Sequence, residues 1–209
     1  MNLNLLIAFV VASLALLATP GPDLLAVIGR GVGQGRYAAI VTVIGYALGD
    51  AIQTTFAILG LSALIRSSAI AFEIVKYIGA IYLVFLGIQE IRHKQSRMVK
   101  KSKEIISPAV VLRQSIVASI LNPKTALFFL AFLPQFVDVT KGNIKVQLFI
   151  LGIVFMVLGI VAYAPIAYFA GSIGHWLQTK QKIVENLRWV TGSIFILLGL
   201  RVAFLKQSH

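Results

Sequence analysis

The chain has 209 residues, of which 58% are hydrophobic and only 12% are charged. This composition is typical of an integral membrane protein and lies outside the range of soluble globular domains. The formal net charge is +12, but the basic residues lie between apolar stretches, so they indicate membrane topology rather than a nucleic-acid-binding face. The chain has no cysteine, which excludes disulfides, thiolate metal sites and thiol redox chemistry.

A membrane-spanning helix needs about 20 mostly apolar residues, and six stretches of the chain are candidates. They are Leu3–Ile28, Tyr37–Leu64, Phe72–Ile91, Val110–Val137, Val146–Ile173 and Leu187–Leu205. Proline interrupts the first and the fourth. The sequence therefore predicts an all-α integral membrane protein with six transmembrane helices, or with five spans if the first stretch is re-entrant.

The two proline interruptions occupy corresponding places in the two halves of the chain. One consists of Pro20, Gly21 and Pro22, and the other of Asn122 and Pro123. Lipid offers no hydrogen bonds to replace those that a broken helix loses, so a break at membrane depth must face protein or a watery cavity. Paired breaks of this kind are the best sequence indication of a transporter's binding site.

The linker at residues 92–108 is the main topology signal, because it carries six basic residues against one acidic residue. The positive-inside rule makes this linker cytoplasmic and places both termini outside. It separates a first three-helix repeat, residues 1–91, from a second, residues 109–209. Segments 76–83 and 188–196 resemble each other, and each is followed by a further glycine, Gly87 or Gly199. Three spans is an odd number, so the expected fold is a 3+3 inverted repeat with broken first and fourth helices that meet near the midplane.

Each break also marks the start of a half-helix. Proline is favoured at the first helical position, Asn122 is a good N-cap and Gly21 an acceptable one. The free N–H groups and positive dipole end of such a half-helix favour a carboxylate ligand. Asp23 is explained either by this dipole or by substrate binding. Lys124 is disfavoured by the dipole, so it requires an acid, an anionic ligand or a path to water.

A further acidic residue, Asp50, lies midway along the second stretch. Helical spacing places Tyr46 and Gln53 on its face, beside a small-residue stripe at Gly45 and Gly49 that suits close helix packing. An aspartate at the centre of a membrane helix costs roughly 2.5–3.5 kcal/mol on insertion scales. Asp50 is therefore either a hydrogen-bonded structural residue or a proton or cation site, and we assign it with Tyr46 and Gln53 to a candidate substrate- or proton-binding site.

Other features point to no catalytic, metal or cofactor site. The glycines between positions 29 and 35 do not follow a strand, as a nucleotide-binding fingerprint requires. His93, His175 and His209 are scattered and form no metal-ligand set. We expect neither a cofactor nor a resident metal.

Taken together, the motifs resemble the lysine-exporter (LysE/RhtB) family of bacterial amino-acid exporters, and its homoserine/threonine/leucine branch in particular. They are Pro20-Gly21-Pro22-Asp23 with Gly31–Gly35, Gly45-xxx-Gly49-Asp50, Gly79-Ala80-x-Tyr82-Leu83-xxx-Gly87, Asn122-Pro123-Lys124 and Phe132-x-Pro134-Gln135-Phe136. The resemblance covers essentially the whole chain. It implies a six-span carrier in the lipid bilayer of the bacterial inner membrane that exports amino acids and is driven by protons.

The leading hypothesis is export of a neutral amino acid by alternating access. Asp23 or Asp50 would bind the substrate ammonium, and Lys124 and the half-helix ends its carboxylate. Protonation of Asp50 from outside would release the ammonium. Alternatives are export of a cation or other small solute, an intramembrane aspartyl protease using Asp23 and Asp50, and a structural subunit. The spans lack a His, Cys or Met cluster for soft metals, Asp50 lacks the protease pattern Gly-x-Gly-Asp, and a structural subunit leaves the charged breaks unexplained.

Overall fold

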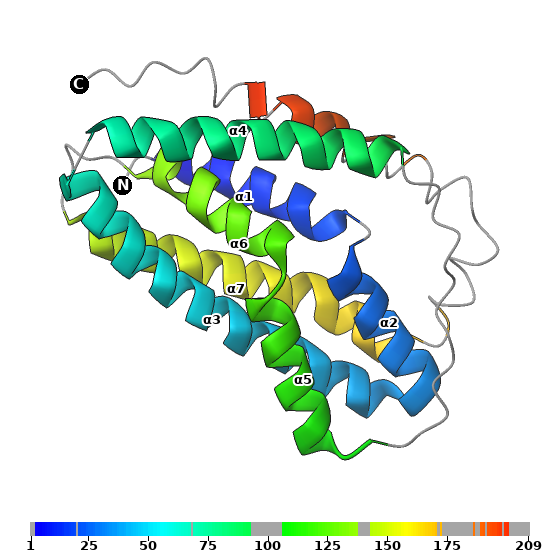
Figure 1. Ribbon diagram of the computed structural model, residues 1–209. Coiled ribbons are helices and arrows are strands. Elements are labelled where there is room, and N and C mark those ends of the chain that lie inside the picture. Colours follow the sequence, from blue (N-terminus) through cyan, green and yellow to red (C-terminus); the bar gives the residue numbers. More distant parts are fainter. Residues whose placement is uncertain are drawn as a thin grey trace.

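The computed structural model describes residues 3–19, 21–67, 69–92, 106–137 and 143–170, with shorter pieces at 172, 186, 189–190, 192–197 and 199–200. All regular secondary structure within these residues is helical (Figure 1). The elements are α1 (Leu3–Ala18), α2 (Pro22–Gln34), α3 (Arg36–Ser67), α4 (Ala69–Arg92), α5 (Pro108–Ile120), α6 (Pro123–Phe132), the 3-10 helix η1 (Leu133–Phe136) and α7 (Ile144–Tyr168).

Both predicted helix breaks are confirmed. At the first, α1 and α2 meet at an angle of 52°, and the second half-helix begins at Pro22 after Gly21 as its N-cap. At the second, α6 begins at Pro123 after Asn122, whose side chain accepts a hydrogen bond from the backbone N–H of Lys124. Each proline occupies the first helical position, where its missing N–H costs no hydrogen bond. Pro20 lies outside the described residues.

Several helices have the length and composition to cross a membrane. In the part of the chain that the structure describes, α3 over Arg36–Gly60 and α7 meet both requirements, and the bent pair of α1 and α2 makes a third span if counted as one. Positions 93–105 of the basic linker and most of the sixth predicted stretch lie outside the described residues. The six-span 3+3 arrangement therefore stays a prediction.

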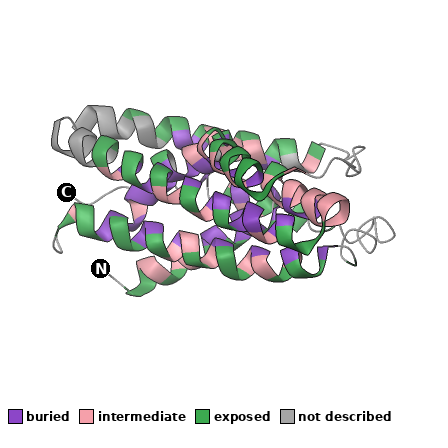
Figure 2. Ribbon diagram, turned by 90° about the horizontal axis from the view of Figure 1, so that it is seen from below, coloured by how far each residue is buried: buried purple, intermediate pink, exposed green. Residues whose placement is uncertain are grey.

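The outer faces of the helices carry large apolar side chains. Buried residues line the interior of the bundle while exposed ones cover its outside (Figure 2). Ile81, Val161 and Phe56 are 70%, 64% and 62% exposed. Isolated exposed apolar residues are normal on soluble proteins, but large contiguous apolar faces are not. This distribution is the one expected of helices whose outer faces contact lipid.

The long helix α3 packs against α2, α5 and α7, and α4 lies over α6 (Figure 1). The approach of α3 to α5 depends on the predicted small-residue stripe. A Cβ atom added to Gly45 would lie 2.5 Å from the Cβ of Ser115, and one added to Gly49 would lie 2.4 Å from the Cβ of Ser119. Only glycine permits this close packing, which brings the α3 backbone beside the end of α5.

An aromatic cluster holds the short helix α6 against its neighbours. The ring of Phe128 stacks on that of Phe132 with centroids 5.0 Å apart, and Phe129 meets Phe155 of α7 edge-on at 5.0 Å. Phe9 of α1 lies 6.2 Å from Phe128. Because aromatic pairs add both buried area and preferred geometry, the cluster fixes α6 between α1 and α7 and so positions the second break.

Candidate functional site

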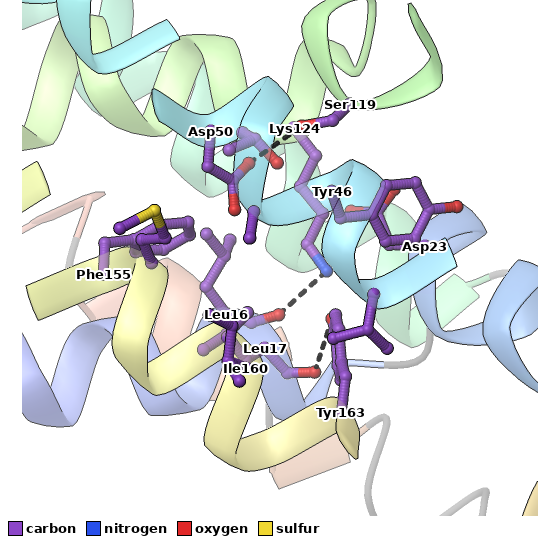
Figure 3. A pocket seen from close by; sticks show the side chains of 15 residues that line it. Leu16, Leu17, Asp23, Tyr46, Asp50, Ser119, Lys124, Phe155, Ile160 and Tyr163 are labelled. Atoms are coloured by element: carbon purple, nitrogen blue, oxygen red, sulfur yellow. Dashed lines mark hydrogen bonds between the residues drawn. The ribbon is translucent and has the colours of Figure 1, made fainter. Parts of the chain in front are cut away.

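The charged residues predicted from the sequence converge on one small buried cavity (Figure 3). Asp23 of α2, Tyr46 and Asp50 of α3 and Lys124 of α6 all line it. The other two predicted residues, Asn122 and Gln53, are buried beside it and bind groups at its edge. The structure thus brings together the residues of both breaks and the polar face of α3.

Asn122 connects the two breaks directly. Its side-chain Nδ2 donates a hydrogen bond of 2.6 Å to Oδ2 of Asp23, and its Oδ1 accepts one of 3.0 Å from the backbone N–H of Lys124. The same side chain therefore caps α6 and binds the acid in the first turn of α2. Asn122 is only 4% exposed, and its two hydrogen bonds, which are partly buried, hold the starts of the two half-helices together.

Lys124 lies in the first turn of α6, but its ammonium group reaches the carboxyl end of α1. Nζ donates hydrogen bonds to the backbone carbonyls of Leu16 at 3.0 Å and Thr19 at 3.3 Å. The last carbonyls of a helix have no partner within it, and a cation is favoured at that end. The sequence predicted that this lysine needs a partner; α1 supplies one that was not among the predicted partners. The ammonium is also attracted electrostatically to Asp23.

The end of α5 is bound in a comparable way by α3. Nε2 of Gln53 donates to the carbonyls of Ser119 at 2.5 Å and Ile120 at 3.3 Å, and Oγ of Ser119 donates to Oδ1 of Asp50 at 2.9 Å. Gln53 therefore satisfies the last carbonyls of α5, as Lys124 does for α1. The sequence predicted Asp50 to be either a hydrogen-bonded structural residue or a proton or cation site. Its second oxygen, Oδ2, lies beside the cavity, 4.0 Å from the position that a Cβ on Gly159 would occupy.

Two residues of the site were not identified from the sequence. Ser119 binds Asp50, and its place three residues before the N-cap Asn122 is a signal that marks the end of a half-helix. Tyr163 of α7 lines the cavity and donates from its hydroxyl to the carbonyl of Leu17 at 3.1 Å. A tyrosine within an apolar helix carries no such signal, because packing and interfacial tyrosines look the same in sequence.

The walls of the cavity combine charge with aliphatic surface. Its apolar lining consists of Leu16, Leu17, Val43, Ala47, Phe155, Met156, Gly159 and Ile160. The two carboxylates and one ammonium leave one negative charge uncompensated among these three groups when all are ionised. Asp23 and Asp50 also repel each other. The site is therefore suited to a ligand that brings a positive group, whether a proton or an ammonium, together with an apolar group.

The sequence model of the LysE type translocator family matches residues 14–206. The chain belongs to this family. The predicted resemblance is thus confirmed, and membership indicates a translocator rather than an enzyme. No solved structure matches the chain of this LysE-type protein.

Its curated relatives match over nearly their full length. A protein of Salmonella typhimurium (strain LT2) named leucine efflux protein is 29% identical over 203 residues, which are 95% of this chain and 94% of the relative. An uncharacterized membrane protein of Vibrio cholerae is 28% identical over 206 residues, 99% of this chain and all of the relative. The uncharacterized membrane protein YrhP of Bacillus subtilis is 30% identical over 207 residues, covering 94% and 97% of the two chains.

Proposed function

We propose that this LysE-type translocator exports neutral amino acids, such as leucine, threonine and homoserine, across the bacterial inner membrane by proton antiport. The observation that carries the proposal is the single cavity in which Asp23, Asp50 and Lys124 meet aliphatic walls. The names of the leucine efflux relatives support the same substrate class.

The chemistry of the cavity matches both ends of a zwitterion. An aspartate binds the substrate ammonium, and Lys124 with the N-terminus of α6 or α2 binds its carboxylate. The aliphatic wall receives the side chain. A dibasic amino acid would need a further acid to bind its side-chain charge, and among the described residues that line the cavity the acids are Asp23 and Asp50 alone. Because a buried charge without a partner is costly, the cavity favours neutral side chains.

Proton coupling follows from the balance of charge. A zwitterion has no net charge, so it does not remove the excess negative charge of the cavity, whereas a proton does. In the proposed cycle Asp50 carries the substrate ammonium on the way out and a proton on the way back. Competition between proton and ammonium for one carboxylate would couple the two opposing fluxes.

Alternating access is supported by the small size of the cavity. Its volume is about 20 Å³. This is room for roughly one water molecule and far too little for an amino acid. Substrate binding therefore requires the surrounding helices to move apart. The breaks provide places for that motion, because the half-helix ends are bound by exchangeable side-chain hydrogen bonds rather than by a continuous helix.

Contacts between α4 and the sixth predicted stretch support the 3+3 inverted repeat that we propose. A Cβ on Gly87 would lie 2.5 Å from the carbonyl oxygen of Gly192, and one on Gly199 would lie 2.7 Å from that of Ala80. Gly87, late in α4, thus lies beside Gly192, early in the sixth predicted stretch. Ala80, earlier in α4, lies beside Gly199, later in that stretch. Such reciprocal, antiparallel pairing is what a two-fold axis between two copies generates.

Efflux measurements test the proposal. The purified chain is reconstituted in liposomes loaded with a panel of labelled amino acids, and export is followed with and without an imposed proton gradient. We expect export of neutral amino acids that accelerates when protons can move the opposite way. Absence of amino-acid export would contradict the proposed substrate class. Export at the same rate with and without the proton gradient would contradict proton coupling.

The alternatives give different results in the same preparation. A cation exporter would move metal ions across the membrane without amino acids in the liposomes. An intramembrane protease would cleave a reporter span and would do so without any gradient. A structural subunit would do neither.

A further inference from the structure

Gly159 occupies the centre of the cavity-lining face of α7. Phe155 and Met156 lie one turn before it and Tyr163 one turn after it, and all four line the cavity. The glycine itself is buried. Its missing side chain is therefore part of the shape of the cavity.

Gly159 differs from other buried glycines of the described helices. A Cβ on Gly152, two turns earlier on α7, would lie 2.1 Å from the Thr54 side chain, so that glycine is required for packing between α7 and α3. A Cβ on Gly45 or Gly49 would likewise clash with a side chain of α5. Of the described residues, a Cβ on Gly159 would instead meet only Leu17 Cδ2 at 3.9 Å and Asp50 Oδ2 at 4.0 Å within 4 Å, which is ordinary van der Waals contact.

We infer that Gly159 is a specificity-determining residue that sets the size of the amino-acid side chain accepted at the cavity. This inference rests on the proposed function. A Cβ at position 159 would lie 4.0 Å from Asp50 Oδ2. A substrate whose ammonium binds this oxygen therefore has its α-carbon and first side-chain carbons beside Gly159. Any atom added at position 159 therefore competes with the substrate for the same space.

The size of the effect follows from the size of the cavity. The cavity of about 20 Å³ has room for roughly one water molecule. A methyl group is about as large as a water molecule. One added methyl group therefore takes up much of the free space that becomes the substrate pocket when the helices move apart. In an apolar pocket, one methylene group changes discrimination roughly 10- to 200-fold.

The substitution Gly159→Ala is suited to the test because it leaves the fold intact. The added Cβ comes no closer than 3.9 Å to any atom in the part of the chain that the structure describes. Among the described residues only Gly35 has a positive φ angle, so position 159 accepts an alanine backbone. Alanine also has a higher helix propensity than glycine. Gly60→Ala is the matched control, since no atom of the described residues lies within 4 Å of a Cβ on Gly60 of α3.

The experiment compares export of leucine and of alanine from proteoliposomes containing each variant. We expect Gly159→Ala to lower leucine export at least tenfold relative to alanine export, and Gly60→Ala to leave the ratio unchanged. Leu17→Ala, which shortens the side chain nearest to the new methyl group, is expected to restore leucine export when combined with Gly159→Ala.

Each outcome bears on one proposal. A wild-type protein that exports leucine, with the same leucine-to-alanine ratio in Gly159→Ala, overturns the role of Gly159 and leaves the proposed function standing. Equal loss of both substrates with normal protein amount also overturns it, since Gly159 would then serve helix movement and not size selection. A wild-type protein that exports no amino acid overturns the proposed function and the inference with it.

Discussion

The substitution Lys124→Gln tests how one ammonium group serves both the fold and the substrate. Nζ binds the carbonyls of Leu16 and Thr19 at the end of α1 and attracts Asp23. Removing the charge leaves carbonyls at the end of α1 with weaker partners. It also leaves Asp23 without a compensating cation in the cavity.

The expected loss of stability is moderate. Removing the ammonium leaves the partly buried carbonyls of Leu16 and Thr19 without this donor and the half-buried Asp23 without its cation, at a cost of about 1–3 kcal/mol. Adding Asp23→Asn removes the uncompensated charge. The double variant is therefore expected to regain about 1–3 kcal/mol relative to the sum of the single changes.

The expected loss of substrate binding depends on the substrate's carboxylate. A hydrogen bond to a charged group contributes about 1.5–3 kcal/mol, which corresponds to a roughly 10- to 150-fold change in apparent affinity. Lys124→Gln should weaken leucine by this amount and its amide, which lacks the carboxylate, much less. Asp50→Asn should instead weaken every competitor with a free ammonium and spare analogues without one.

The assay is competition in proteoliposomes. Unlabelled leucine, leucine amide and an N-acetylated leucine compete with labelled leucine for exchange, and thermal unfolding in detergent is measured on the same variants. Lys145→Gln is the matched control, because Lys145 also follows an asparagine N-cap by two residues, Asn143, but is exposed at the start of α7. The control should change neither affinity nor melting temperature.

Equal weakening of leucine and its amide by Lys124→Gln would refute the assignment of this ammonium to the substrate carboxylate. The lysine would then act only on the carbonyls of α1. Additive losses of stability in the double variant would show that Lys124 and Asp23 do not compensate each other.

Three further predictions concern coupling, packing and topology. Asp50→Asn should abolish the acceleration of export by the proton gradient, because it leaves no carboxylate for which proton and ammonium compete, and normal gradient-driven export would refute its role in coupling. Gln53→Leu removes the donor to the last carbonyls of α5 and should cost about 1–3 kcal/mol, seen as a lower melting temperature in detergent; an unchanged value would mean that water replaces the side chain. Cysteines at Met98 and Gln207, in a chain without natural cysteine, should react differently with an impermeant maleimide in intact cells. Labelling of position 98 but not 207 would reverse the predicted topology.

The helix breaks and their N-caps were predictable because their causes are local. Proline lacks a backbone N–H in any fold. The side chain of an asparagine that precedes it can accept a hydrogen bond from the backbone N–H two residues after the asparagine. The charges at Asp23, Asp50 and Lys124 were recognisable because ionised groups are costly within apolar stretches of any fold. Composition and covalent chemistry thus determined the class of protein, the places where its helices break and the residues that carry charge into them.

Only the tertiary structure decided which groups those residues meet. Lys124 binds the end of α1 more than 100 positions away, and Asp50 binds Ser119 across 69 positions. Such partners depend on how helices pack, and the packing depends on many weak contacts that no short motif contains. Gly159 is the clearest case. In sequence it is one of 17 glycines, and only the surrounding helices make it an opening into the cavity while they close tightly over Gly152.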